Sequence, residues 1–172
     1  MKRPIAALAA IIILSSLAGC AQEEPLGAGR LSDSKAPAQL LRVEAHSRIP
    51  GYMVSSTADA NEGSKSCDTS DPKGLERFWR SSVEVYMLDN ASVRPAAIVD
   101  EIVASFVDQD WVAEEGESSL ITKLSKDSIA STISLSRTPM DTGGTITIAV
   151  DGPCVMTDGA EDPAVKKLDG RP

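Results

Sequence analysis

Alternating apolar and polar residues predict three strands in the C-terminal half of the chain. Residues 129–135 place Ile or Leu at every second position, interrupted only at Ser131, and residues 145–150 alternate in the same way. Residues 119–125 show a weaker version of the pattern. Alternation is typical of antiparallel strands that have one face in a core and one in water. The polar segments 126–127 and 139–144 predict the turns between these strands.

Two helices and one further strand are predicted upstream. Residues 37–47 are rich in helix formers, and residues 78–88 are rich in β-branched and aromatic side chains. Between residues 92 and 108, apolar side chains recur at helical spacing, and Ser92 can cap that helix. The order helix, strand, helix, then three strands predicts an α+β fold. We expect an antiparallel sheet of about four strands with the helices packed on one face.

The remaining segments lack a clear period. Residues 54–74 have loop composition, residues 20–35 read as a flexible linker, and residues 158–172 read as a disordered tail. The chain has 172 residues, which fits a single domain. We therefore place that α+β domain at residues 36–157.

Residues 1–19 have the composition of a lipoprotein signal peptide. Two basic residues precede an apolar run at 5–14, which is too short to span a bilayer. The sequence Leu-Ala-Gly-Cys at 17–20 then resembles the bacterial lipobox, whose Cys is acylated and becomes the mature N-terminus. The alternative is an ordinary signal peptide with a chance Cys. The resemblance implies that Cys20 carries the lipid.

A lipid on Cys20 would determine where the protein works. Two or more acyl chains hold a protein stably on a membrane. We therefore expect an extracytoplasmic protein that is anchored to the outer face of the cell membrane by the lipid on Cys20. We also expect it to bind an envelope protein or polymer that is not yet identified. The linker after Cys20 would let the domain move near the bilayer.

The cysteine count agrees with an exported protein. Cys20 is assigned to the lipid, which leaves Cys67 and Cys154. An even remainder in an exported chain predicts one disulfide, and only one pairing is possible. The alternatives are two free thiols, one of them catalytic, or a metal site, but a metal site would need further Cys or His ligands.

Several short motifs together resemble small uncharacterised lipoproteins common in actinobacteria. These motifs are the lipobox, the early Cys67, the Trp79-Arg80-Ser81-Ser82 strand start, Asp110-Trp111 after a helix, and Gly-Pro-Cys-Val at 152–155. In such sequences a Gly often precedes the Trp, where this chain has Asp110. The resemblance implies lipid attachment and the cysteine pair, and it implies no activity.

Charge and motif content exclude several functions. The net charge of −8 disfavours nucleic acid as a ligand. The chain has one His, at position 46, and it lacks a nucleophile elbow, phosphate-binding loops and a zinc-protease motif. We therefore predict no catalytic residue, no metal ligand and no cofactor.

Two groups of residues remain as candidates for chemistry. The acidic residues within 108–117 could act as paired carboxylates or hold calcium, although a solvated turn explains them more simply. Trp79, Arg80 and Trp111 are candidates for binding because Trp anchors interfaces. The competing interpretation is that both Trp side chains cover the core, and the sequence favours it because aromatic residues are only 3% of the chain.

We therefore expect a non-enzymatic module that binds an envelope protein or cell-wall polymer. The alternatives are a small hydrolase that uses carboxylates and a carrier of a small apolar ligand. A hydrolase needs carboxylates that converge in a cleft, whereas a carrier needs an apolar cavity.

Overall fold

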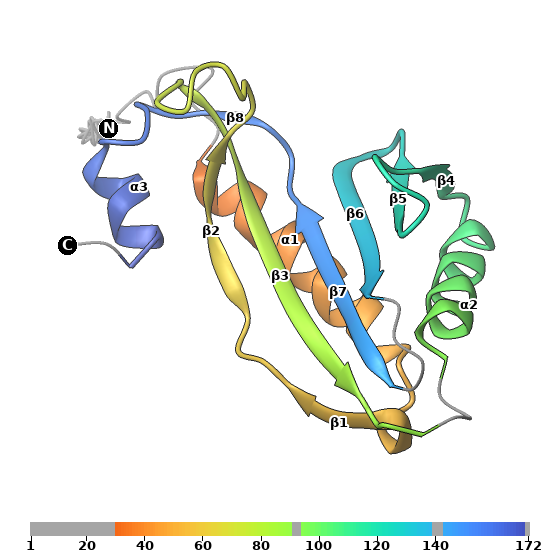
Figure 1. Cartoon of the computed structure of the whole chain (residues 1–172). Helices are drawn as coiled ribbons and strands as arrows, with labels where there is room; N and C mark the ends of the chain where they lie inside the picture. Colours follow the sequence, from red (N-terminus) through yellow and green to blue (C-terminus); the bar gives the residue numbers. More distant parts are fainter. Residues whose placement is uncertain (1–29, 91–93, 139–142, 171–172) are drawn as a thin grey trace, which may run out of the picture.

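The computed structural model describes residues 30–90, 94–138 and 143–170 (Figure 1). The expected leader, Cys20, the linker up to residue 29, Ser92 and most of the turn at 139–144 lie outside these ranges. The elements are α1 (Leu31–Ser47), the short 3-10 helix η1 (Gly51–Met53), β1 (Val54–Thr57), β2 (Asn61–Ser66), β3 (Glu76–Met87), α2 (Pro95–Val107), β4 (Val112–Glu115), β5 (Ile121–Lys126), β6 (Ile129–Thr138), β7 (Gly144–Asp151), β8 (Val155–Met156) and α3 (Pro163–Leu168).

The strands form one antiparallel sheet in the order β1-β3-β7-β6-β5-β4. β1 and β2 pair with successive parts of the same edge of β3. β7 and β8 pair with successive parts of its other edge. The α+β class and the antiparallel sheet are confirmed. The sheet has eight strands within the described part of the chain, so the prediction of about four strands was too low.

The molecule has two layers. Along β3 every second residue, from Arg77 to Met87, is buried, while the residues between them are exposed or half-buried. The buried side of the sheet shares one apolar core with α1 and α2. Figure 1 shows α1 lying behind β3 and β7, with α2 near β4, β5 and β6. The burial of α2 through Ile98, Val99, Ile102 and Phe106 follows the helical period read from the sequence.

α1 lies close against the sheet between the end of β7 and the start of β8. Three residues, 152–154, separate the two strands there, so β3 has no regular partner on that side. The hydroxyl Oγ of Ser34, in α1, accepts the Trp79 backbone N–H at 2.8 Å, and Gly152 N–H donates to the Trp79 carbonyl at 2.9 Å. Ser34 is completely buried. A helix side chain thus satisfies a strand group that would otherwise be buried without a partner.

α2 ends in a Schellman arrangement. Trp111 N–H donates to the Phe106 carbonyl and Asp110 N–H to the Val107 carbonyl. Asp110 adopts a φ of 65°, in the left-handed region that favours Gly. The ring of Trp111 packs edge-on against that of Phe106, with centroids 5.4 Å apart. The reversal directs the chain into β4, and a Gly would adopt this φ without steric strain.

The linker and the tail were each predicted too long. α1 begins at Leu31, inside the expected linker 20–35, because Leu31 is buried in the core and Asp33 accepts the Arg30 backbone N–H at the first turn. The expected disordered tail 158–172 contains α3, whose Val165 is only 2% exposed. In both segments, a few tertiary contacts order a stretch that has no strong local pattern.

α3 also protects one edge of the sheet. The Asp169 carboxylate, just after α3, accepts the Ser64 backbone N–H of β2 at 2.6 Å and the Ser64 hydroxyl at 3.1 Å. Lys35, from α1, donates to the Leu168 carbonyl at 3.5 Å. Figure 1 shows α3 beside β2. An unpaired strand edge can pair with a strand of another molecule. Because the Ser64 N–H donates to Asp169, this part of the β2 edge is not available for such pairing.

Candidate functional site

The predicted disulfide is present. Cys67, just after β2, is bonded to Cys154, just before β8, and the two residues are 87 positions apart. The bond ties the loop 67–75 to the sheet. The sequence reading of 54–74 as one loop was wrong in its first part, because β1 and β2 lie there and pair with β3.

A buried arginine supports the same region. Arg77 is 3% exposed, and its guanidinium donates to Ser64 Oγ at 3.1 and 3.2 Å and to the Pro72 carbonyl at 3.1 Å. A buried charge needs such partners. Sequence reasoning missed this residue because the predicted strand began at residue 78, and Arg is rarely fully buried unless a partner is known.

The two Trp candidates lie in the core. Trp79 is 1% exposed and Trp111 is 5% exposed. The ammonium of Lys35 lies 4.1 Å from the centroid of a Trp79 ring. The core interpretation, which the sequence favoured, therefore holds in this structure, and neither indole ring presents a surface to a partner.

Arg80 is the one member of the predicted binding group that lies at the surface. It projects from the face of β3 opposite to Trp79, and its guanidinium donates two hydrogen bonds of 2.6 Å to Asp151 of β7. The hydrogen bonds to Asp151 raise the pKa of Arg80. It also lies over the Phe78 ring, 5.6 Å from the centroid. The pair neutralises both charges at one end of this face.

Around Arg80 extends the face of the sheet that lies opposite the helical core. The residues that point to this side of the two central strands are exposed or half-buried, and none is buried. Most of them carry a hydroxyl group. They are, on β6 and β7, Ala130, Thr132, Ser134, Ser136, Thr138, Thr145, Thr147, Ala149 and Asp151. We call this set, together with Ser82 of β3 and Ser125 of β5, the hydroxyl face.

The strand register sets the hydroxyls in rows across the sheet. Ser136 lies beside Thr147, and Thr138 beside Thr145. Neighbouring strands are about 4.8 Å apart, so each row presents polar groups at that interval. Alternate residues along one strand are about 7 Å apart. The result is a regular grid of polar side chains, mostly hydroxyls.

Tyr86 and Glu84 border the hydroxyl face on β3. They lie beside Thr145 and Thr147 of β7, respectively. The Tyr86 hydroxyl donates to the Glu84 carboxylate at 3.0 Å, and this hydrogen bond raises the pKa of Tyr86. Tyr86 is 41% exposed and therefore offers an aromatic ring at the margin of the grid.

The acidic segment does not form a convergent site. Residues 112–115 form the edge strand β4, so the side chains of Glu114 and Glu115 point to opposite faces of the sheet. Glu114 lies opposite Lys123 of β5. Within the described ranges, no group of three or more Asp, Glu, His or Cys side chains could hold a metal ion. The prediction that this segment is a turn was wrong, because residues 112–115 form a strand. The prediction that it is solvated holds for β4, whose four residues are all exposed.

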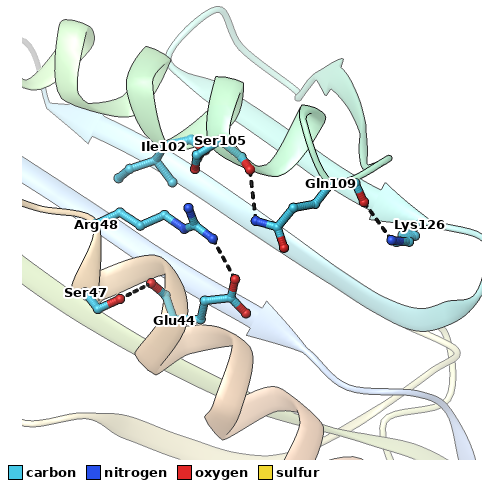
Figure 2. A network of polar contacts seen from close by, with 7 residues as sticks. All are labelled: Glu44, Ser47, Arg48, Ile102, Ser105, Gln109 and Lys126. Atoms are coloured by element: carbon cyan, nitrogen blue, oxygen red, sulfur yellow. Dashed lines mark hydrogen bonds and ion pairs between the residues drawn. The ribbon is translucent and has the colours of Figure 1, made fainter.

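On the opposite, helical side, Figure 2 shows two sets of polar contacts, one within α1 and one that runs from the end of α2 to Lys126 at the end of β5. Arg48 donates to the Glu44 carboxylate at 2.6 Å and lies over the Phe106 ring, 4.6 Å from its centroid. Lys126 donates to the Gln109 carbonyl at 2.6 Å. Arg48 projects from α1 toward α2 in Figure 2, and its position over the Phe106 ring links the two helices.

Comparisons with known proteins add no relationship to these observations. No described helix is long and apolar enough to cross a membrane. The chain matches no protein-family model, and no curated protein or solved structure is significantly similar to it.

Proposed function

We propose that this chain is a lipid-anchored, extracytoplasmic protein that acts by binding a component of the cell envelope and catalyses no reaction. The observation that carries the proposal is the hydroxyl face: a broad surface, opposite the helical layer, with no converging carboxylates. A sheet face of this kind can make many contacts with an extended partner. The buried Trp79 and Trp111 are not needed for the binding.

The sequence of the leader and the disulfide support the extracytoplasmic location. The Leu-Ala-Gly-Cys motif resembles a lipobox, and the resemblance to small actinobacterial lipoproteins implies both lipid attachment and the cysteine pair. Disulfides persist in oxidising compartments and are rare in the cytosol. The Cys67–Cys154 bond is therefore consistent with export.

The chain between the proposed anchor and the domain limits how far the domain reaches. Residues 21–30 separate Cys20 from the first residue of α1. Ten residues reach at most about 35 Å when fully extended. The domain would therefore stay close to the membrane surface, where its partner would be another envelope component.

The anchor is tested by fractionating cells that express the full chain or its Cys20→Ala variant. We expect the wild-type chain in the membrane fraction and the variant outside it, because two or more acyl chains supply the stable attachment. A Cys20→Ala chain that still sediments with membranes would contradict the anchor.

The binding role is tested by photo-cross-linking in intact cells. A photoreactive residue at Ser134, in the middle of the hydroxyl face, is compared with one at Ser32, an exposed position on α1. We expect the Ser134 probe to capture an envelope component and the Ser32 probe to capture none. Equal labelling, or no labelling at Ser134, would contradict the role of this face.

A further inference from the structure

We infer that the partner of the hydroxyl face is a neutral polysaccharide, an inference that rests on the proposed function and specifies its ligand. The argument starts from the chemistry of the grid. A hydroxyl group both donates and accepts hydrogen bonds, and its hydrogen rotates to suit the partner. The hydroxyls of a sugar have the same double capacity, so a row of Ser and Thr side chains complements a sugar chain wherever its hydroxyls fall.

The distribution of charge disfavours ionic ligands. Asp151 is the only ionisable residue among the outward positions of β6 and β7, and it is paired with Arg80. On the adjoining strands, Glu84 of β3 and Lys123 of β5 point to the same side and carry opposite charges, so this face has no excess of either sign. A phosphate-rich polymer needs Lys or Arg for affinity, and the protein as a whole carries a net charge of −8. A neutral polymer meets no such electrostatic opposition.

The absence of large side chains from the middle of the face disfavours a protein partner. Protein interfaces depend on a few large anchors, usually Trp, Tyr or Arg, near the centre of the contact. The outward positions of β6 and β7 hold only small residues and Asp151, and the exposed aromatic ring of Tyr86 lies at the margin on β3. An aromatic ring at the end of a row suits stacking against a sugar ring.

The dimensions of the sheet favour a polymer that lies across the strands. The interval of about 4.8 Å between strands is close to the length of one sugar residue in a chain. A polysaccharide along the row Glu84, Thr147 and Ser136 would therefore meet one polar side chain per sugar. Each contact is weak, and the affinity comes from several contacts on one chain.

The inference is tested with the purified full-length protein on a printed array of neutral and acidic glycans. We expect binding to neutral polysaccharides only. A variant with Thr147→Val and Ser136→Ala keeps the shape of the face and loses two hydroxyls. We expect it to bind about tenfold more weakly, since each hydrogen bond lost weakens binding severalfold.

A matched control removes two hydroxyls from the other side of the molecule. Ser32→Ala and Ser47→Ala lie at exposed positions of α1, and this double variant should bind as the wild type does. Urea unfolding of both variants shows whether the fold is retained. Binding to acidic glycans, no binding to any glycan, or equal binding by a folded Thr147→Val/Ser136→Ala variant would overturn the inference.

The two proposals fail in different ways. If the Ser134 probe in cells captured a protein, the binding role of the face would stand and the polysaccharide inference would be wrong. If it captured a glycan, both would be supported. The array uses purified protein, so its result does not depend on the lipid at Cys20.

Discussion

Replacing Gly152 with Ala should strongly destabilise the fold. A Cβ at this position would lie 2.5 Å from Ser34 Oγ and 2.9 Å from the Ser34 carbonyl carbon, and closer still to the Ser34 carbonyl oxygen. Because the obstruction includes helix backbone, α1 must move away from the sheet. Over-packing costs about 1–3 kcal/mol. Loss of the Ser34–Trp79 hydrogen bond leaves a buried N–H without an acceptor, at a further cost of about 1–3 kcal/mol.

Urea unfolding followed by Trp fluorescence measures this effect, because both Trp residues are buried. The expected loss of about 3–5 kcal/mol corresponds to a shift of about 2 M in the urea midpoint, for a slope near 2 kcal/mol/M. Gly51→Ala is the control, since no atom lies within 4 Å of its Cβ. A Gly152→Ala protein within about 0.5 kcal/mol of the control would refute the close approach of α1.

Three further substitutions or treatments test other parts of the structure. Asp110→Gly should raise the free energy of unfolding by about 1 kcal/mol, because Gly adopts a positive φ without strain, and a higher thermal midpoint would show it. Asp169→Ala should cost about 1–2 kcal/mol and speed hydrogen exchange of the Ser64 amide, and unchanged exchange would contradict the capping of β2. Reduction of the Cys67–Cys154 bond should lower stability by up to about 4–5 kcal/mol on the chain-entropy estimate, and equal urea midpoints with and without reductant would argue against a stabilising role.

The elements predicted well are those in which local and tertiary requirements agree. α2 was predicted at 92–108 and observed at Pro95–Val107, with Pro at its first position, where the missing N–H costs nothing. β6 and β7 alternate because one side packs on the helices and the other lies opposite them. The sequence pattern in these segments is a direct consequence of burial.

The elements that were missed depend on distant partners. β2 (Asn61–Ser66) contains no large apolar residue, and its strand conformation comes from pairing with β3. β4 consists of exposed residues on an edge, so burial leaves no alternating signal. The first turn of α1 and the short helix α3 are held by contacts with distant segments, through the buried side chains of Leu31 and Val165. For β2 and β4 likewise, strand formation depends on the neighbouring strands more than on the local sequence.

The candidate site also contains one part that the sequence predicted and one part that it did not. The disulfide could be predicted because exclusion of Cys20 left one possible pair. The hydroxyl residues were visible as the polar half of each alternation, but their grouping into one surface was not. The predicted hairpin of β6 and β7 brings most of these residues together, but the addition of Ser82, Arg80 and Tyr86 depends on β3 lying beside β7. Those two strands are about sixty residues apart in the chain and are joined through α2 and three other strands. Local pattern alone carries no information about that neighbour.

The position of α1 connects the proposed anchor with the proposed binding surface. α1 belongs to the helical layer, and the chain that leads back to Cys20 leaves the domain at its first turn. A lipid at Cys20 would therefore hold the domain at one end of its helical layer. That layer lies on the side of the sheet opposite to the hydroxyl face. Within the reach of residues 21–30, the sheet can turn away from the bilayer and meet a polymer that lies above the membrane. Because this attachment point belongs to the helical layer, the proposed anchor would leave the hydroxyl face free for its proposed partner.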